Sequence, residues 1–259
     1  MKKSHFAAFV VLAGLISLAQ PVWSQMNGKQ IMEAVYTRPS GSDLQGDLTM
    51  TLTNKQGDER VRQLRQFITD NGSIEKTLMF FLSPADVRNT SFMSWSYADG
   101  KDDDQWIYLP ALKRTKRISS DSKGDYFMGS DFTYDDLGDR HPDEDNHTLL
   151  REEKLGNYDC FVVESTSKQP GYMYSKTITW VNKDNFIGLK REFYDEAKMP
   201  LKTLYIHKFE KINSFWTILE TEMVNTQKNH RTKMVFSNVK INQGIPDNKF
   251  TERSMTLGQ

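Results

Sequence analysis

The sequence has almost no cysteine and no excess of charge of either sign. Cys160 is the only cysteine, so no disulfide can form within the chain and stability must come from an apolar core. It begins the apolar stretch Cys160-Phe161-Val162-Val163, which indicates a buried, unreactive thiol. The 34 basic residues balance the 34 acidic ones. This balance argues against a general nucleic-acid-binding protein.

Short catalytic and phosphate-binding motifs are also missing. The chain contains none of the patterns G-x-S-x-G, G-x-x-x-x-G-K-[ST], G-x-G-x-x-G and H-E-x-x-H. His141 and His147 flank the acidic loop at residues 142–146, where a metal site or an unfamiliar enzyme centre is conceivable. The loop lacks regular ligand spacing, and acidic loops are usually just solvated. We therefore expect no metal, no cofactor and no enzymatic activity, and we expect the acidic run Asp102-Asp103-Asp104 to protect a hairpin tip from edge pairing.

Residues 1–24 have the features of a cleaved signal peptide. Lys2 and Lys3 give a positive start, and residues 6–18 form an apolar stretch that is too short to span a bilayer comfortably. The small-residue exit at residues 22–24 is typical of a signal-peptidase site. We expect cleavage after Ser24 and export of residues 25–259 as a single domain, to the periplasm in a Gram-negative source. A retained membrane anchor is the alternative.

Period-two alternation of apolar and polar residues dominates the mature chain. Turn signals such as Gly156-Asn157 and Pro170-Gly171 separate the alternating runs, with no helix-length gaps that parallel strands would need. The pattern therefore predicts antiparallel strands at residues 44–53, 59–69, 77–82, 93–97, 105–109, 114–118, 148–155, 158–167, 175–182, 188–195, 201–212, 215–225 and 230–241.

Three segments interrupt this pattern. Asn27 is placed to cap a helix at residues 28–36, and Ser130 or Asp131 to cap a second helix at residues 132–137. Residues 245–250 are expected to form a closing strand or turn. Such small helices cannot cover a large apolar sheet, so we expect the sheet to curl on itself, which leaves room for a hollow.

The large apolar side chains on the predicted strands are candidates to line that hollow, although a packed core is the alternative. Twelve methionines favour an adaptable lining over a rigid core. The assignment depends on register, because a slip of one residue reverses the faces of a strand. The expected lining residues are Met50, Leu52, Met79, Phe81, Met93, Trp95, Trp106, Tyr108, Trp180, Phe193, Met234 and Phe236.

A basic run follows the aromatic stretch at residues 105–109. It could be a nucleic-acid patch, a membrane contact or the solvated rim of a hairpin, and the balanced net charge disfavours the first of these. We interpret it as a rim that docks a partner. The expected docking residues are Arg114, Lys116, Arg117, Phe132 and Tyr134.

Several of these segments together resemble a known family. Residues 106–110 (WIYLP), 114–118 (RTKRI) and 129–137 (GSDFTYDDL) resemble the signature block of the outer-membrane lipoprotein-sorting proteins related to LolA and LolB. Residues 244–251 and the helix near Ile31 are similar to the ends of these proteins. The resemblance implies a mainly β fold, in which a strongly curved antiparallel sheet forms an incomplete β-barrel and short helices plug its concave face around a hydrophobic cavity.

The resemblance also implies a function. Members of the family carry lipid moieties, and this branch is linked with resistance-nodulation-division exporters. We therefore expect a monomeric periplasmic carrier of lipid or lipoprotein acyl chains between the inner and outer membranes. It would work with an inner-membrane transporter, touch membranes transiently and bind no nucleic acid. The alternative is an exported docking module of such a transporter with no cargo of its own.

Overall fold

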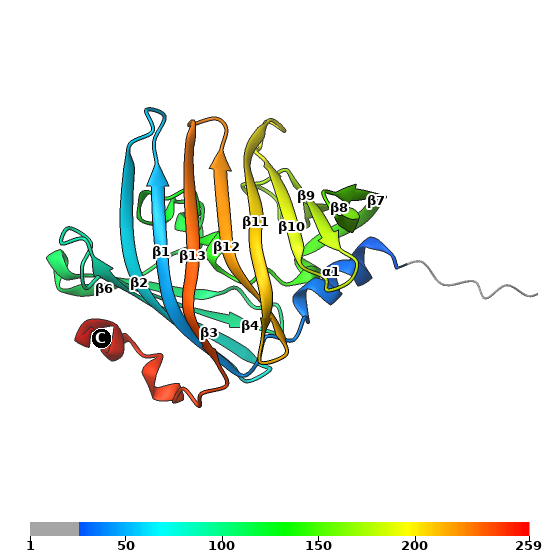
Figure 1. Ribbon diagram of the computed structural model, residues 1–259. Helices are drawn as coiled ribbons and strands as arrows, with labels where there is room; N and C mark the ends of the chain where they lie inside the picture. Colours follow the sequence, from blue (N-terminus) through cyan, green and yellow to red (C-terminus); the bar gives the residue numbers. More distant parts are fainter. Residues whose placement is uncertain (1–25, 259) are drawn as a thin grey trace, which may run out of the picture.

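The computed structural model describes residues 26–258, so the predicted signal peptide lies outside the described residues. A single antiparallel sheet of 13 strands forms the molecule, in the order β6-β5-β4-β3-β2-β1-β13-β12-β11-β10-β9-β8-β7. Neighbours in this order are neighbours in sequence everywhere except where β1 pairs with β13. Because β6 and β7 lie at opposite edges, the sheet curves without closing into a barrel (Figure 1). The predicted fold class is confirmed.

All the predicted strands are present, with ends that differ by a few residues. The alternation is local because short connections join consecutive strands, and every strand from β2 to β13 except β7 pairs with the one before it. The strands are β1 (Asp43–Thr53), β2 (Glu59–Asp70), β3 (Ile74–Ser83), β4 (Ser91–Tyr97), β5 (Asp104–Leu109), β6 (Arg114–Arg117), β7 (Asp145–Leu155), β8 (Tyr158–Ser167), β9 (Lys176–Asn182), β10 (Gly188–Tyr194), β11 (Pro200–Ile212), β12 (Phe215–Asn225) and β13 (His230–Ile241).

Helix α1 (Gly28–Tyr36) covers one face of the sheet at β7 and β8, and we call this the inner face. Asn27 caps it as predicted: its side chain accepts a hydrogen bond from the Gln30 backbone N–H, and Gln30 Oε1 accepts one from the Asn27 N–H. Ile31 and Met32 on the buried side of the helix pack against Val163 and other inner-face residues.

The connection from β6 to β7 also lies on the inner face, and we call its residues 119–137 the inner plug. Phe127 is fully buried in it and packs against Phe81 and Phe92 of the sheet. The predicted helix at residues 132–137 is wrong for its first half, because only the 3-10 turn Asp135–Leu137 forms. Residues before it stay extended, since the Phe127 N–H bonds to the Phe132 carbonyl and tertiary contacts hold the segment.

The outer face of the sheet carries the C-terminal helix α2 (Glu252–Leu257), which contacts β4, β5 and β6 (Figure 1). The expected closing element at residues 245–250 is a 3-10 turn, Asp247–Lys249, and α2 was not predicted. A helix of this length has too few residues to show a helical period, and Thr251 caps it through the Ser254 N–H. Within residues 26–258, no helix is long and apolar enough to cross a membrane.

Candidate functional site

The residues expected to line a hollow fall on both faces of the sheet. Those on the inner face pack under the inner plug in two clusters, one around Phe127 and one around Phe132 and Tyr174. There they belong to a packed core, and their contact with a guest stays a prediction. These inner-face residues are Met50, Leu52, Met79, Phe81, Phe193, Met234 and Phe236.

The remaining candidates lie on the outer face. Met93, Trp95, Trp106 and Tyr108 pack with Phe250 and Met255 from the C-terminal segment. Trp180 packs with the buried Cys160 on the outer side of β8 and β9, and its indole N–H donates to Glu153. The structure therefore divides the predicted lining residues between the two faces of the sheet.

A cavity opens where the inner plug ends. It has a volume of about 340 Å³ and lies between α1, residues 135–142 and the inner faces of β8, β9 and β10. We call it the chamber. A cleft of about 810 Å³ adjoins it at the start of β3 and shares Tyr36, Glu75 and Asp139 with its wall. Both volumes are of the size that small-molecule sites have.

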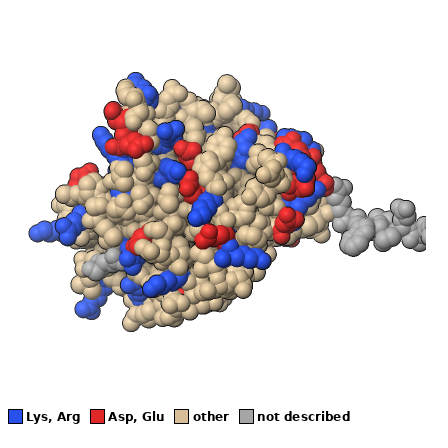
Figure 2. All heavy atoms as spheres, in the orientation of Figure 1, with Lys and Arg blue, Asp and Glu red and all other residues tan. Residues whose placement is uncertain are grey.

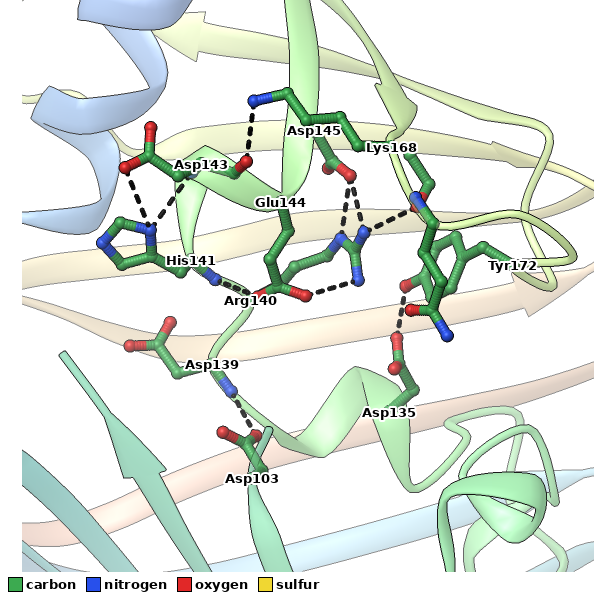
Figure 3. Close-up of polar contacts among 12 residues, drawn as sticks. Asp103, Asp135, Asp139, Arg140, His141, Asp143, Glu144, Asp145, Lys168 and Tyr172 are labelled. Atoms are coloured by element: carbon green, nitrogen blue, oxygen red, sulfur yellow. Dashed lines mark hydrogen bonds and ion pairs between the residues drawn. The ribbon is translucent and has the colours of Figure 1, made fainter. Parts of the chain in front are cut away.

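Two carboxyl groups, those of Glu75 and Asp139, lie where the chamber meets the cleft, and a third, that of Asp103, lies beside Asp139. The Asp139 N–H donates to Asp103 Oδ2 at 3.1 Å (Figure 3). Glu75, the second residue of β3, is close enough to both aspartates for their carboxylates to repel its own. Among residues 26–258, none of the three carboxylates has a basic group within 4 Å. Burial, followed by repulsion from Asp139, Asp70 and Asp103, raises the pKa of Glu75 to about 8.

The two aspartates respond in the same way. Desolvation raises the pKa of Asp139 to about 7, with repulsion from Asp103 as the next cause. Desolvation also raises the pKa of Asp103 to about 6, although the hydrogen bond from the Asp139 backbone opposes the rise. Carboxyl groups perturbed by both burial and mutual repulsion are typical of functional sites.

Arg191 on β10 brings a positive charge to the same chamber. Its Nε donates to Thr179 Oγ1 at 3.1 Å, and within the described part of the chain no carboxylate forms an ion pair with it. Burial lowers the pKa of Arg191. The guanidinium nevertheless stays protonated, so the chamber holds an unpaired cation.

A polar network fixes one wall of the chamber. Arg140 donates to Asp145 Oδ1 at 2.7 and 3.0 Å, to Glu144 Oε2 at 3.0 Å and to Ser167 Oγ at 2.9 Å (Figure 3). Its guanidinium also stacks 4.0 Å from the ring of Tyr172. These contacts clamp the end of the β6–β7 connection to β7 and β8, so the wall is rigid.

Comparison with known proteins decides the family. An outer membrane lipoprotein-sorting protein domain from Vibrio parahaemolyticus is 33% identical, and the alignment covers 88% of this chain and 98% of that one, with a TM-score of 0.83. The chain belongs to the outer-membrane lipoprotein-sorting family. The resemblance read from residues 106–110, 114–118 and 129–137 is thus confirmed.

Two further structures and a family model extend the comparison. A DUF1329 family protein from Desulfovibrio piger is 29% identical over 88% of this chain and 97% of its own, with a TM-score of 0.83. A LolA superfamily protein from Nitrosomonas europaea shares the fold at 20% identity, over 89% and 100% of the two chains, with a TM-score of 0.68. Residues 73–257 match the model of a family described as an uncharacterized protein. No functionally curated protein matches the chain.

The residues predicted to dock a partner lie partly on the surface and partly in the interior. Arg114 and Lys116 are exposed on the edge strand β6, and Arg117 beside them pairs with Asp104. Phe132 is only 6% exposed and belongs, with Tyr134, to the inner plug. A docking surface on β6 therefore contains the cations without the two rings.

The two histidines of the acidic loop have hydrogen-bond partners within the chamber wall. His147 lies between Ser165 Oγ at 2.7 Å and the Pro142 carbonyl at 2.8 Å, which assigns the proton to Nε2. His141 Nδ1 accepts a hydrogen bond from the Asp143 N–H at 3.1 Å. Among residues 26–258, no group of three or more His, Cys, Asp or Glu side chains could hold a metal ion.

Sequence reasoning missed Glu75, Asp139 and Arg191. Alternation places Glu75 on the same face of β3 as Met79 and Phe81, and it places Arg191 on the same face of β10 as Phe193. A charged residue in phase with inward-facing apolar residues was the available signal for both. Asp139 lies in an irregular connection, where no periodicity could have indicated its direction.

Proposed function

We propose that the protein is a periplasmic carrier that shields lipid or lipoprotein acyl chains on their way between the inner and outer membranes. The observation that carries the proposal is the 33% identity to an outer membrane lipoprotein-sorting protein domain that is covered over 98% of its length. The family fold adds support, because an unclosed curved sheet gives a cargo an entrance that a closed barrel would deny.

The energetics of such a cargo fit the architecture. Transfer of an acyl chain into water costs about 0.8 kcal/mol per methylene, which is on the order of 12 kcal/mol for a sixteen-carbon chain. The chamber and its cleft offer Met32 and Val35 of α1 and Phe193 of β10 as apolar wall, beside the charged groups. A cavity with such mixed walls holds a hydrocarbon chain without irreversible binding, as a carrier requires.

Blocking the chamber is expected to weaken the binding of an acyl chain. Thr177 lines it from the inner face of β9, and Thr177→Trp would fill the space with an indole. We expect the affinity for a fluorescent fatty acid to fall roughly tenfold or more. Thr166 on β8 faces the opposite side from Ser165, so Thr166→Trp is the matched control and should bind like the wild type. Unchanged binding by a folded Thr177→Trp variant would contradict the carrier function of the chamber.

The carrier is further proposed to receive its cargo from an inner-membrane transporter of the resistance-nodulation-division type, docking through the β6 edge. Figure 2 shows Lys and Arg side chains projecting at the left-hand end of this view, where β6 lies, and Arg114 and Lys116 are among its exposed residues. Charges on an interface rim mainly accelerate encounter and set orientation. An exposed basic edge therefore suits a transient docking step.

Charge reversal tests this step. Arg114→Glu with Lys116→Glu is expected to reduce co-sedimentation with inner-membrane vesicles of the source bacterium several-fold, most strongly at low salt. The control, Lys55→Glu with Lys208→Glu, makes the same charge change at exposed sites away from β6 and should sediment like the wild type. Equal loss on vesicles of the extracted lipids alone would show that β6 recognises lipid instead of a transporter. Retained sedimentation by a protein that binds no apolar probe would favour the cargo-free docking module.

A further inference from the structure

An arginine and two carboxyl groups face the same empty space in the chamber without forming an ion pair. Arg191 uses only its Nε within the protein, and Arg38 nearby donates Nη1 to the Trp216 carbonyl at 2.6 Å while its Nε has no partner. Glu75 and Asp139 lie in the same walls. Within residues 26–258 the fully buried Lys202 forms an ion pair with Asp136, whereas neither Arg191 nor Arg38 has a carboxylate partner.

Rigid surroundings keep these charges apart. Thr179 holds the Arg191 guanidinium to β9, and the Asp103 carboxylate holds the Asp139 backbone. A charged group that cannot reach a partner of opposite charge is left partly desolvated beside the cavity, and this costs free energy in the ligand-free protein. A ligand with both charges would satisfy both sets of groups and recover that cost.

We propose that the chamber binds the head group of a zwitterion, with a phosphate on Arg191 and an ammonium group against Glu75 and Asp139. This inference rests on the carrier function proposed above, since it names the class of cargo. The planar guanidinium fork has the geometry for a phosphate, and it is preorganised by its bond to Thr179. An ammonium group carries three donors and matches carboxylates that have no basic neighbour.

The protonation state of the carboxyls gives an independent signature. Glu75 and Asp139 have pKa values raised to about 8 and about 7, so near pH 7 they hold protons for part of the time. An ammonium group beside them favours the charged form, which lowers both pKa values. Binding of the zwitterion should therefore release protons to the buffer, whereas an uncharged amphiphile should release none.

The test compares three amphiphiles with the same single acyl chain: lyso-phosphatidylethanolamine, lyso-phosphatidylglycerol and monoacylglycerol. We expect the wild type to prefer the zwitterion over monoacylglycerol about tenfold or more. Arg191→Gln should remove most of that preference, so that its affinities for the zwitterion and for monoacylglycerol become similar. Glu75→Gln with Asp139→Asn should remove the preference for lyso-phosphatidylethanolamine over lyso-phosphatidylglycerol. Titration calorimetry in buffers of different ionisation enthalpy measures affinity and proton release together.

Controls separate the outcomes. Arg231→Gln removes an exposed arginine of β13 and should change none of the affinities. Arg191→Lys keeps the positive charge but lacks the planar pair of N–H donors, so it should retain part of the preference for a phosphate that Arg191→Gln loses. If Arg191→Gln fails to fold, the Glu75→Gln, Asp139→Asn double variant and the measurement of proton release still test the proposal. Soluble glycerophosphoethanolamine distinguishes a free solute from a lipid: binding as tight as that of the lipid would support the zwitterion chemistry with a soluble ligand.

Two results would overturn one hypothesis each. Equal affinity for all three amphiphiles, with no proton release, would overturn the zwitterion site and leave the acyl carrier intact. Failure to bind any of the acyl chains, with glycerophosphoethanolamine still bound through Arg191, would overturn the carrier function and leave the head-group chemistry standing.

Discussion

Replacing Lys202 by methionine is expected to lower the free energy of unfolding by roughly 3–5 kcal/mol, because it leaves a buried carboxylate without its counter-charge. The Lys202 side chain is fully buried on β11 and pairs with Asp136, whose side chain is 5% exposed. Its Nζ also donates to the Asp131 carbonyl at 3.1 Å and lies 5.1 and 5.2 Å from the rings of Tyr174 and Phe193. Methionine supplies the bulk of lysine and none of these polar contacts.

Urea denaturation of the variant measures the effect. Lys208→Met on the same strand is the control, because its side chain is 58% exposed and its loss should change stability by less than about 0.5 kcal/mol. Lys202→Met combined with Asp136→Asn should recover part of the loss, since the amide removes the charge, its oxygen can accept from the Thr133 N–H, and its NH2 group can donate to the Tyr174 hydroxyl. An unchanged denaturation midpoint in the single variant would mean that the pair contributes no net stability.

The Lys202 pair explains why the inner plug is ordered without regular structure. Asp136 ties it to β11, and the Asp131 carboxylate ties it to β13 by accepting from Thr232 Oγ1 at 2.7 Å and contacting His230 at 2.7 Å. Both aspartates belong to the segment GSDFTYDDL, which resembled a family signature. Within this fold the signature therefore encodes the anchors of the plug. The sequence led us to expect Phe132 and Tyr134 of this segment to dock a partner, and it did not single out the acidic residues.

The strands could be predicted because their signal is local. In a sheet where nearly every strand pairs with its predecessor, period-two alternation and turn residues are enough to place the elements. Asn27 and its helix were predictable for the same reason, since a capping box involves residues three apart. Helix α2 was missed because its Met255 packs on strands far away in sequence, and no pattern inside a helix of 6 residues shows that.

The face of each strand could not be predicted, and β4 shows the reason. Its sequence alternates Met93 and Trp95 with Ser94 and Ser96, so the large residues were assigned to the inside. The structure places them outward, where Phe250 and Met255 cover them, and turns the small serines inward. Alternation fixes which residues share a face and leaves open which face is inside. That choice is made here by a segment more than a hundred residues away.

Glu75 should make the stability of the wild type fall as pH rises. Its pKa rises from 4.5, the ordinary value of a glutamate side chain, to about 8 in the folded protein, so between these values the folded state holds a proton that the unfolded state has released. The free energy of unfolding then decreases with increasing pH, by up to about 1.4 kcal/mol per pH unit for one proton. Glu75→Gln removes this dependence, so the variant should exceed the wild type in stability at pH 8 and above.

Below pH 4.5 the advantage of Glu75→Gln should disappear, because the wild-type carboxyl is then protonated in both states and resembles the amide. Urea midpoints measured from pH 4 to pH 9 give both curves, and Glu210→Gln, at an exposed position of β11, should follow the wild type throughout. Parallel curves for Glu75→Gln and the wild type would mean that water or a counter-ion offsets both the burial of Glu75 and its repulsion from Asp139, Asp70 and Asp103. A divergence that vanishes when lyso-phosphatidylethanolamine is bound would instead place the ligand's ammonium group against Glu75, since the same charge that stabilises the carboxylate removes its penalty on folding.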